Sequence, residues 1–197
     1  MDTPPLDRDY LEGELFNLIR IADLVVIVVD LQANPLQQLE DTVIILEKNR
    51  IVRDTSRQPN PDGQRLVYKP FIVVVNKCDN DSTQEDFEIY CELVGGEWDC
   101  IPVSTVTGRN LGRLKRVLFD SLEIIRVYSR PPGEEADLQK PFAVKKGTTV
   151  AEFAGRIHRD FSDKLKSARV WGSGAFDGQM VSRDHILQDG DIVELKA

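Results

Sequence analysis

The sequence has few of the residues that build disulfide frameworks or metal centres. Cys78, Cys91 and Cys100 are an odd number and include no Cys-x-x-Cys pair, so we expect them to be reduced packing residues. His158 and His185 are the only histidines. We therefore expect neither a disulfide nor a metal site.

Long apolar runs are also missing. No run reaches the roughly 18 residues that a membrane-spanning helix needs, and the first residues lack the basic and apolar pattern of a secretion signal. We expect a cytoplasmic protein with no membrane partner. With 197 residues, 41% of them hydrophobic, the chain can bury a core and form one large or two small domains.

The net charge of −8 is unevenly distributed along the chain. Residues 1–124 carry 13 Lys and Arg against 22 Asp and Glu, a net of −9, and residues 125–197 carry 12 against 11, a net of +1. Because an acidic surface repels a phosphate backbone, any contact with nucleic acid is expected on the second part. An ordinary solvated surface is the alternative.

Residues 1–124 alternate between strand and helix patterns. Leu24–Val29 is a continuous β-branched run ending at Asp30, typical of a strand buried on both faces, and Phe71–Val75 repeats the pattern. Between them, Asn34 and Pro35 give a cap and a first-turn proline ahead of apolar residues at helical spacing. This order predicts a β-α-β unit with parallel strands.

The alternation continues to the end of this part. Ser82 and Glu85 predict a capping box for a second helix, Cys100–Val103 predicts a third strand, and Asn110 predicts the cap of a last helix. We therefore expect a parallel α/β sheet that binds its ligand at the carboxyl ends of the strands. The polar segment Asp54–Lys69 is expected to be an exposed excursion.

Residues 125–197 change to short strands around one helix. Thr149 and Glu152 predict a capping box for that helix, and strands are expected at Arg126–Ser129, Phe142–Lys145, Ala168–Trp171 and Ile192–Leu195. One helix over a small mixed sheet is a β-grasp pattern. The junction falls near Leu122–Arg126, which gives a first domain of residues 1–124 and a second of residues 125–197.

Two short motifs follow successive strands of the first domain. Asn76, Lys77, Cys78 and Asp79 fit the Asn-Lys-x-Asp motif of GTPases, and Ser104 opens a loop similar to the Ser-Ala-x loop that completes their guanine pocket. The resemblance implies that Asp79 accepts two N–H groups of guanine and that Asn76 braces the pocket. It also implies that the Lys77 stem covers the ring and that Ser104 orients Asp79.

The residue types suit this chemistry. Two carboxylate oxygens match two parallel N–H donors, and adenine would leave Asp79 unpaired at a cost of about 1 to 3 kcal/mol or more. Thr105 stands where alanine is usual, and the resemblance implies that its backbone N–H contacts the base oxygen. The structural alternative is that Asn76 and Asp79 only cap the following turn.

The phosphate-binding elements of GTPases are absent or altered. The sequence contains no Gly-x-x-x-x-Gly-Lys followed by Ser or Thr, the loop that holds the phosphates and Mg²⁺. Asp2 opens a segment that resembles the Asp-x-x-Gly element, but Pro5 replaces the glycine and offers no N–H. We expect weak GTP or GDP binding, no hydrolysis by this chain, and Mg²⁺ only in a longer parent protein of which the chain is a fragment. A naturally degenerate GTPase is the alternative.

The second domain carries the closest family resemblance. Residues 126–133 (RVYSRPPG), 148–153 (TTVAEF) and 170–172 (VWG) resemble the TGS domain of the developmentally regulated GTP-binding proteins, relatives of the Obg family. The resemblance implies a P-loop-GTPase-like α/β domain followed by a β-grasp TGS domain that contacts RNA, the ribosome or a regulatory protein. The alternative is a nucleotide-independent interaction module in which the first domain is a scaffold.

Several residues of the second domain have two interpretations. Trp171 and Phe153 are expected to be core or rim packing residues rather than base-stacking platforms. A basic face is conceivable from Lys145, Lys146, Arg156, Arg159, Lys164, Lys166 and Arg169. Because Asp160 and Asp163 are interleaved with these cations, RNA binding depends on the resemblance more than on charge.

The Leu24–Val29 strand carries one more expectation. In GTPases it lies between the Phe71 strand and a strand of the phosphate-loop segment, so one of its edges should be unpaired here. Free backbone groups and high β-propensity favour pairing with another chain. We expect self-association through this edge, or its coverage by residues 2–21 with Leu11, Leu15 and Leu18 as the apolar face.

Overall fold

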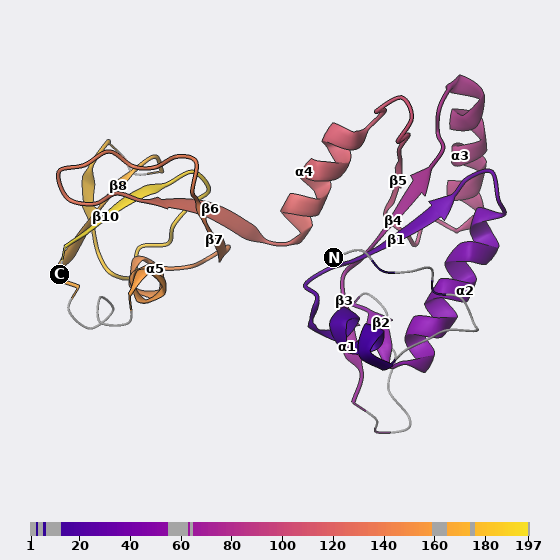
Figure 1. The fold of residues 1–197 in the computed structure, drawn as a ribbon, viewed down its shortest axis with the longest axis horizontal. Coiled ribbons are helices and arrows are strands. Elements are labelled where there is room, and N and C mark those ends of the chain that lie inside the picture. The colour runs from indigo at the N-terminus through magenta and orange to yellow at the C-terminus, as the bar shows by residue number, and fades with distance from the viewer. Residues whose placement is uncertain are drawn as a thin grey trace. The chain divides into compact units, whose positions relative to one another are not determined.

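The computed structural model describes Thr3, Leu6, residues 13–54, Gly63 and residues 65–158, 165–173 and 176–196. The chain divides into two compact units, Met1–Leu122 and Glu123–Ala197 (Figure 1). Within the part of the chain that the structure describes, no helix has the length and apolar character to cross a membrane.

The first unit is built on a parallel sheet of three strands, in the order β1-β4-β5. These are β1 (Val25–Asp30), β4 (Phe71–Asn76) and β5 (Cys100–Pro102). The register places Asp30 beside Asn76, so the two strands end at the same level. The expected α/β class is confirmed, and β4, with five consecutive buried residues, is the central strand that its continuous apolar run predicts.

Helices cover the two faces of this sheet. One face packs against α1 (Gly13–Ile21), α2 (Pro35–Lys48) and α3 (Asp81–Leu93), whose apolar residues join Ile27, Val29, Val73 and Val75 in a single core. The other face packs against α4 (Leu111–Ser121), which covers Ile72, Val74, Ile101 and Val103. The side chains of β4 and β5 thus alternate between two apolar layers, which fixes their register.

The prediction that the first strand is buried on both faces is wrong. Val26 and Val28 are 39% and 63% exposed, whereas Ile27 and Val29 are buried. The cause is the position of α4, whose apolar residues pack against β4 and β5 rather than against these two valines. In the described residues β1 pairs with β4 alone, so it is an edge strand.

The helix caps differ from the prediction. The capping box of α3 is formed by Asn80 and Thr83 rather than by Ser82 and Glu85, with Asn80 Oδ1 accepting from Thr83 N at 3.0 Å. Asn80 with Thr83 and Ser82 with Glu85 both have residue types that can form a capping box. The helix begins at Asp81, directly after the turn that follows Asp79, so Asn80 is the residue at the cap position. Asn34 and Asn110 do precede their helices, but both are left-handed, with φ of 56° and 59°, and neither makes a side-chain cap bond.

A two-stranded parallel sheet joins β2 (Ile51–Arg53) to β3 (Val67–Lys69). The prediction for Asp54–Lys69 was an exposed excursion, and the structure adds that its last three residues form a strand, β3. Residues 55–62 and 64 lie outside the described part of the chain. Three-residue strands leave too short a pattern to detect in the sequence.

The predicted apolar face of the amino-terminal segment is only partly right. Phe16 and Ile19 of α1 are buried in the core, and Leu15 packs against it. Leu18 is 42% exposed, and Leu11 lies outside the described residues. The face of α1 that packs into the core is therefore rotated from the predicted one, and it contains Phe16.

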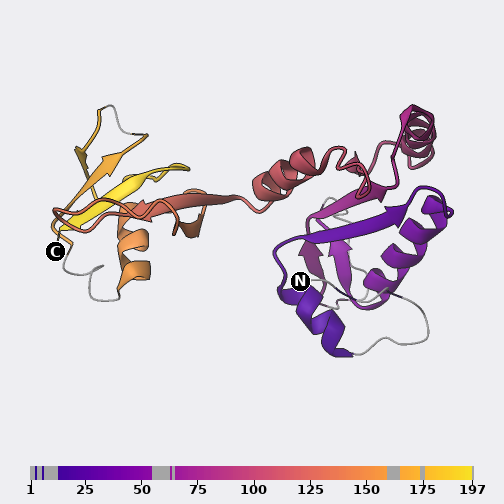
Figure 2. The ribbon, with the colours of Figure 1, turned by 45° about the horizontal axis from the view of Figure 1, so that its top comes forward.

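The second unit is a mixed sheet of five strands in the order β7-β6-β10-β8-β9, with one helix (Figure 2). The strands are β6 (Ile124–Ser129), β7 (Phe142–Lys145), β8 (Ser167–Trp171), β9 (Gln179–Val181) and β10 (Ile192–Lys196), and the helix is α5 (Val150–Ile157). The predicted Thr149–Glu152 capping box is confirmed, and only β9 was not foreseen. Phe153, fully buried, centres the core between helix and sheet.

Candidate functional site

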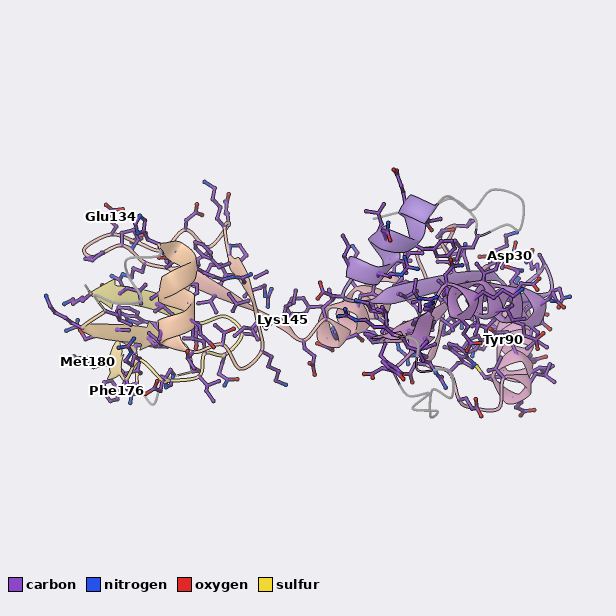
Figure 3. All side chains as sticks on the ribbon, turned by 90° about the horizontal axis from the view of Figure 1, so that it is seen from below. Asp30, Tyr90, Glu134, Lys145, Phe176 and Met180 are labelled. Atoms are coloured by element: carbon purple, nitrogen blue, oxygen red, sulfur yellow. The ribbon has the colours of Figure 1, made fainter. Side chains whose placement is uncertain are left out.

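The carboxyl ends of the parallel strands bring three chain segments together. Asp30 ends β1, Asn76 to Asp79 follow β4, and Ser104 opens the loop after β5. This is the edge at which parallel α/β sheets bind ligands, because the helices that follow the strands turn away and leave their amino-terminal loops facing one space. Asp30 is labelled in Figure 3.

The two sequence motifs are linked by a short hydrogen bond. Ser104 Oγ donates to Asp79 Oδ1 at 2.5 Å. The Ser104 Oγ atom also accepts a hydrogen bond from Thr107 N at 3.0 Å. Ser104 is fully buried, whereas Asp79 is half-buried. Because Thr107 uses the acceptor side of the hydroxyl, the hydroxyl proton is directed at Asp79. The carboxylate is thereby oriented, and its Oδ2 has no partner within the described residues.

Asn76 spans the same two motifs through the backbone. Its Oδ1 accepts from Thr105 N at 3.3 Å. The resemblance implies a contact between this N–H and a base oxygen, but here the N–H is directed at Asn76. The side chains of Asn76 and Asp79 therefore bond to the second loop, and the cap of α3 is Asn80. Simple turn capping by Asn76 and Asp79 is not what the structure contains.

Lys77 is held across the site by a residue that sequence reasoning did not assign. Its Nζ lies 2.5 Å from Asp30 Oδ2, and Asp30 Oδ1 accepts from Gln32 N at 3.0 Å. The hydrogen bond from Lys77 lowers the pKa of Asp30 below its usual value, against the opposing effect of partial burial. Lys77 adopts a left-handed backbone, with φ of 69°, which is uncommon for a residue with a side chain.

Two further side chains brace the site, one from α2 and one from the loop after β5. Gln38 of α2 accepts from Asp30 N at 2.9 Å and donates to Asp30 O at 3.2 Å, so it fixes the end of β1. Arg109 donates to Asn80 O at 3.1 Å and to Gln84 Oε1 at 3.2 Å, so it ties the second loop to α3. Neither contact has a sequence signal, because both join positions that only the folded chain brings together.

The sequence also suggested Asp2 as part of a phosphate and magnesium site. Asp2 lies outside the described residues, so its predicted place near phosphate and magnesium stays a prediction. Over the described ranges, no group of three or more His, Cys, Asp or Glu side chains could hold a metal ion.

In the second unit, Trp171 is a half-buried rim residue. The Arg130 guanidinium lies 4.5 Å from the centre of its ring. A Cβ added at Gly178 would lie 3.1 Å from Trp171 Nε1, so the backbone there also approaches the indole closely. These contacts fit the packing interpretation. Two residues of the basic face considered from the sequence, Arg159 and Lys164, lie outside the described residues.

Comparisons with known proteins found a matching domain family and similar proteins. Residues 125–197 match the family model of the TGS domain. Three similar relatives are an uncharacterized GTP-binding protein, MJ1326, of Methanocaldococcus jannaschii, developmentally-regulated GTP-binding protein 1 of Xenopus laevis, and ribosome-interacting GTPase 1 of Saccharomyces cerevisiae. They are 37%, 32% and 32% identical over 66%, 68% and 65% of this chain. The chain spans only about a third of their length, 33%, 35% and 34%.

A solved structure supports the fold. The YchF GTPase of Schizosaccharomyces pombe superposes with a TM-score of 0.65 over 93% of this chain and 75% of that one, at 14% sequence identity. Identity this low informs the fold alone. The parallel sheet and the β-grasp unit agree with this fold, and residues 125–197 form a TGS domain. These findings fit the resemblance to the developmentally regulated GTP-binding proteins.

Proposed function

We propose that the first unit recognises the guanine base of GTP or GDP, with Asp79 as the residue that reads it. The observation that carries this proposal is the 2.5 Å bond from Ser104 to Asp79, which orients a half-buried carboxylate and leaves one oxygen free. The relatives' description as GTP-binding proteins supports it. Asn76 and Thr105 frame the same space, and the Lys77 stem is positioned to cover the ring.

Base selectivity follows from donor and acceptor patterns. Guanine offers two parallel N–H donors to the carboxylate, whereas adenine offers none in that arrangement. A hydrogen bond to a charged acceptor is worth about 1.5 to 3 kcal/mol, which corresponds to a roughly 10- to 150-fold preference for guanine. The Asp30–Lys77 pair would hold the ammonium at the edge of the ring, so that the stem rather than the charge faces the base.

Catalysis by this chain alone is not part of the proposal. Phosphoryl transfer needs groups that hold the phosphates and a metal ion that neutralises their charge. The sequence lacks the Gly-x-x-x-x-Gly-Lys loop, and the described residues offer no metal cluster. We therefore propose a guanine-recognition half whose binding is weak and whose hydrolysis, with Mg²⁺, requires a longer protein.

The TGS unit is proposed to make contacts with RNA, the ribosome or a regulatory protein. The yeast relative's name, ribosome-interacting GTPase 1, supports such a role for this domain combination. Residues 125–197 are nearly neutral, with 12 basic and 11 acidic residues, and can approach an anionic partner more easily than the acidic residues 1–124.

The competing function is an interaction module that binds no nucleotide. It is favoured by one observation, the engagement of the Thr105 N–H with Asn76, because this N–H would have to turn toward the base in a guanine complex. In that case Asp79 and Ser104 would serve only to join two loops. The two functions differ in whether any purine nucleotide binds at all.

Calorimetric titration of the chain with GDP and ADP tests the proposal. We expect weak GDP binding that is lost in Asp79→Ala, no comparable ADP binding, and no release of phosphate from GTP. Asp99→Ala is the matched control, because Asp99 is an exposed carboxylate just before the amino end of β5. Equal binding of GDP and ADP, or GDP binding unaffected by Asp79→Ala, would remove the guanine assignment.

Self-association through β1 is proposed as a separate property. Its outer edge has no strand partner in the described ranges, and Val26 is 39% exposed. We expect light scattering to show a concentration-dependent dimer that Val26→Lys weakens. A chain that stays monomeric at all concentrations would refute this.

A further inference from the structure

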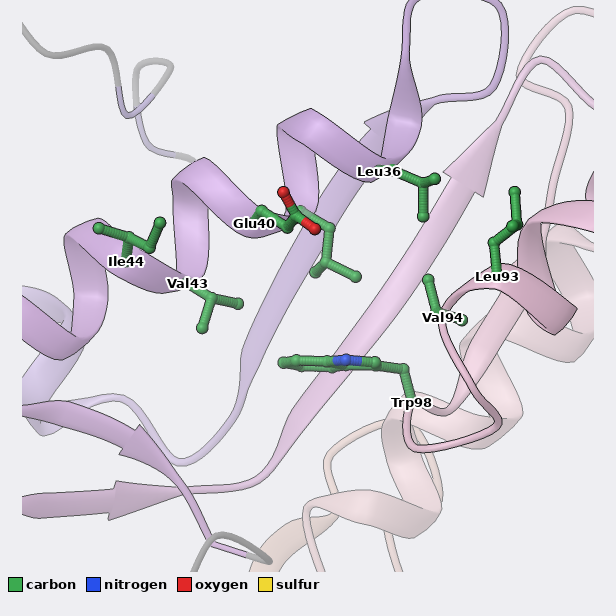
Figure 4. Close-up of a pocket in the computed structure, with 8 residues that line it drawn as sticks. Leu36, Glu40, Val43, Ile44, Leu93, Val94 and Trp98 are labelled. Carbon is green, nitrogen blue, oxygen red and sulfur yellow. The ribbon is translucent and has the colours of Figure 1, made fainter.

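An apolar groove lies on the first unit, away from the nucleotide-base site. It has a volume of about 350 Å³ and runs between α2 and the turn that follows α3 (Figure 4). Leu36, Val43 and Ile44 line it from α2, and Leu93 and Val94 line it from the end of α3. None of these residues belongs to the base-reading motifs.

The groove is lined by exposed aliphatic side chains. Ile44 is 44% exposed and Leu93 is 64% exposed. Ile89, one helical turn before Leu93, is 55% exposed and extends the apolar surface along α3. Scattered exposed aliphatic residues are ordinary, but a hollow lined by several of them marks a binding surface.

One wall of the groove is already fixed in place. Trp98 stacks on Phe71 with ring centres 6.4 Å apart, and the Arg53 guanidinium lies 4.3 Å from the centre of the Trp98 ring. Arg53 also donates to Glu97 O. A large flat ring held by these contacts offers a partner side chain a preformed surface, which reduces the ordering cost of binding.

The two helices that flank the groove are acidic. α2 carries Glu40, Asp41 and Glu47 against the single base Lys48, and Glu40 lines the groove itself. α3 carries five acidic residues, Asp81, Glu85, Asp86, Glu88 and Glu92, and no basic one. Together α2 and α3 carry eight acidic residues and one basic residue, of which Glu40 lines the hollow, and the Arg53 guanidinium lies against its Trp98 wall.

We propose that this groove binds a basic amphipathic helix of a protein partner. A helix laid between two helices places apolar residues at i, i+3 or i+4, and i+7 into the hollow. Its flanking Lys and Arg residues would then face the carboxylates of α2 and α3, which speeds encounter and excludes acidic competitors. This inference is independent of nucleotide binding, because it uses none of the base-site residues.

The charge pattern disfavours the other occupants. A nucleic acid or an anionic membrane would be repelled by the net negative charge of α2 and α3. A second copy of the chain placed here by a two-fold axis would bring the same carboxylates against themselves. A helix with apolar residues on one face and basic residues beside them suits both the hollow and its acidic helices.

The test uses a fluorescein-labelled synthetic peptide of about 18 residues, or five helical turns, with one leucine stripe and lysine on both flanks. Anisotropy of the peptide with the whole chain gives the affinity. We expect Ile44→Ser and Leu93→Ser each to weaken binding about five- to tenfold, because each removes an aliphatic contact. Ile186→Ser is the matched control, since Ile186 is 54% exposed in the second unit.

Two peptide controls separate shape from charge. A scrambled peptide of the same composition and a version with glutamate in place of lysine should both bind at least tenfold more weakly. Added salt should weaken the basic peptide, and Asp79→Asn should leave its affinity unchanged. Thermal melts check that the variants fold, and Leu93→Ala replaces Leu93→Ser if the latter is unstable.

Three results would overturn the proposal. One is equal binding of the scrambled or the acidic peptide. Another is unchanged affinity in both groove variants. The third is a dimer of the chain that Ile44→Ser dissolves, which would make a second copy the occupant.

Discussion

Replacing Asp79 by asparagine should change which base the site prefers. Ser104 Oγ already accepts from Thr107 N, so its proton must find an acceptor at position 79. In Asp79→Asn that acceptor is the amide oxygen, which turns the amide NH₂ toward the base. A donor then faces the N–H groups of guanine, where the wild type presents a carboxylate oxygen.

The magnitude follows from the bonds that change. Guanine loses one charge-assisted hydrogen bond, worth about 1.5 to 3 kcal/mol, so its affinity should fall roughly 10- to 150-fold. Xanthine carries a carbonyl where guanine carries the amino group, and this carbonyl can accept from the new NH₂. We therefore expect Asp79→Asn to favour xanthine over guanine and the wild type to favour guanine.

The assay is competition between GDP and XDP for the wild type and for Asp79→Asn, followed by calorimetry. Asp99→Asn makes the same chemical change at the other end of the sheet and should alter neither affinity. If Asp79→Asn keeps the guanine preference of the wild type, then Asp79 does not read the base and the orientation inferred from Ser104 is wrong.

Three further predictions concern the braces of the site and the second unit. Ser104→Ala should destabilise the first unit by about 1.5 to 3 kcal/mol, measured by urea unfolding, because it removes the 2.5 Å bond to Asp79. Asp30→Asn should cost less, about 0.2 to 1 kcal/mol, because the pair is partly exposed. Lys77 lowers the pKa of Asp30, so this contribution is present above the ordinary carboxyl pKa and is lost as pH falls through the lowered pKa. An acid titration of stability that is the same in wild type and Asp30→Asn would refute the pairing. Gly172→Ala should cost about 2 kcal/mol or more, because φ is 123° and the added Cβ would lie 2.8 Å from Asp191 Oδ1. Gly147→Ala, with φ of 89° and open space, should cost less.

The sequence predicts β1 and β4 because both are continuous apolar runs rich in β-branched residues. Phe71–Asn76 is buried at five successive positions, so neither face leaves a polar residue to obscure the pattern. The helix caps are harder to predict from the sequence, because Asn80, Ser82 and Asn110 are all suitable cap residues. Their actual roles depend on distant partners, as when Asn110 Nδ2 donates to Pro102 O at 2.9 Å.

The motifs gave the base-site candidates, but not the residues that support them. Asp30 reads in the sequence only as the polar end of a strand. Its place beside Lys77 follows from the parallel register that pairs Asp30 with Asn76. Gln38 and Arg109 likewise act through contacts between elements. Such residues need the folded arrangement, because local periodicity carries no information about which strand ends lie together.

The most direct test of guanine recognition is a ¹⁵N NMR titration of the chain with GMP, with AMP as the comparison. GMP shares the base but carries little phosphate, so its effects report on base reading alone. We predict that GMP shifts the backbone amides of Asn76, Asp79, Ser104 and Thr105, and that AMP leaves them unmoved. GMP shifts confined to other parts of the chain, or equal shifts with AMP, would contradict the account.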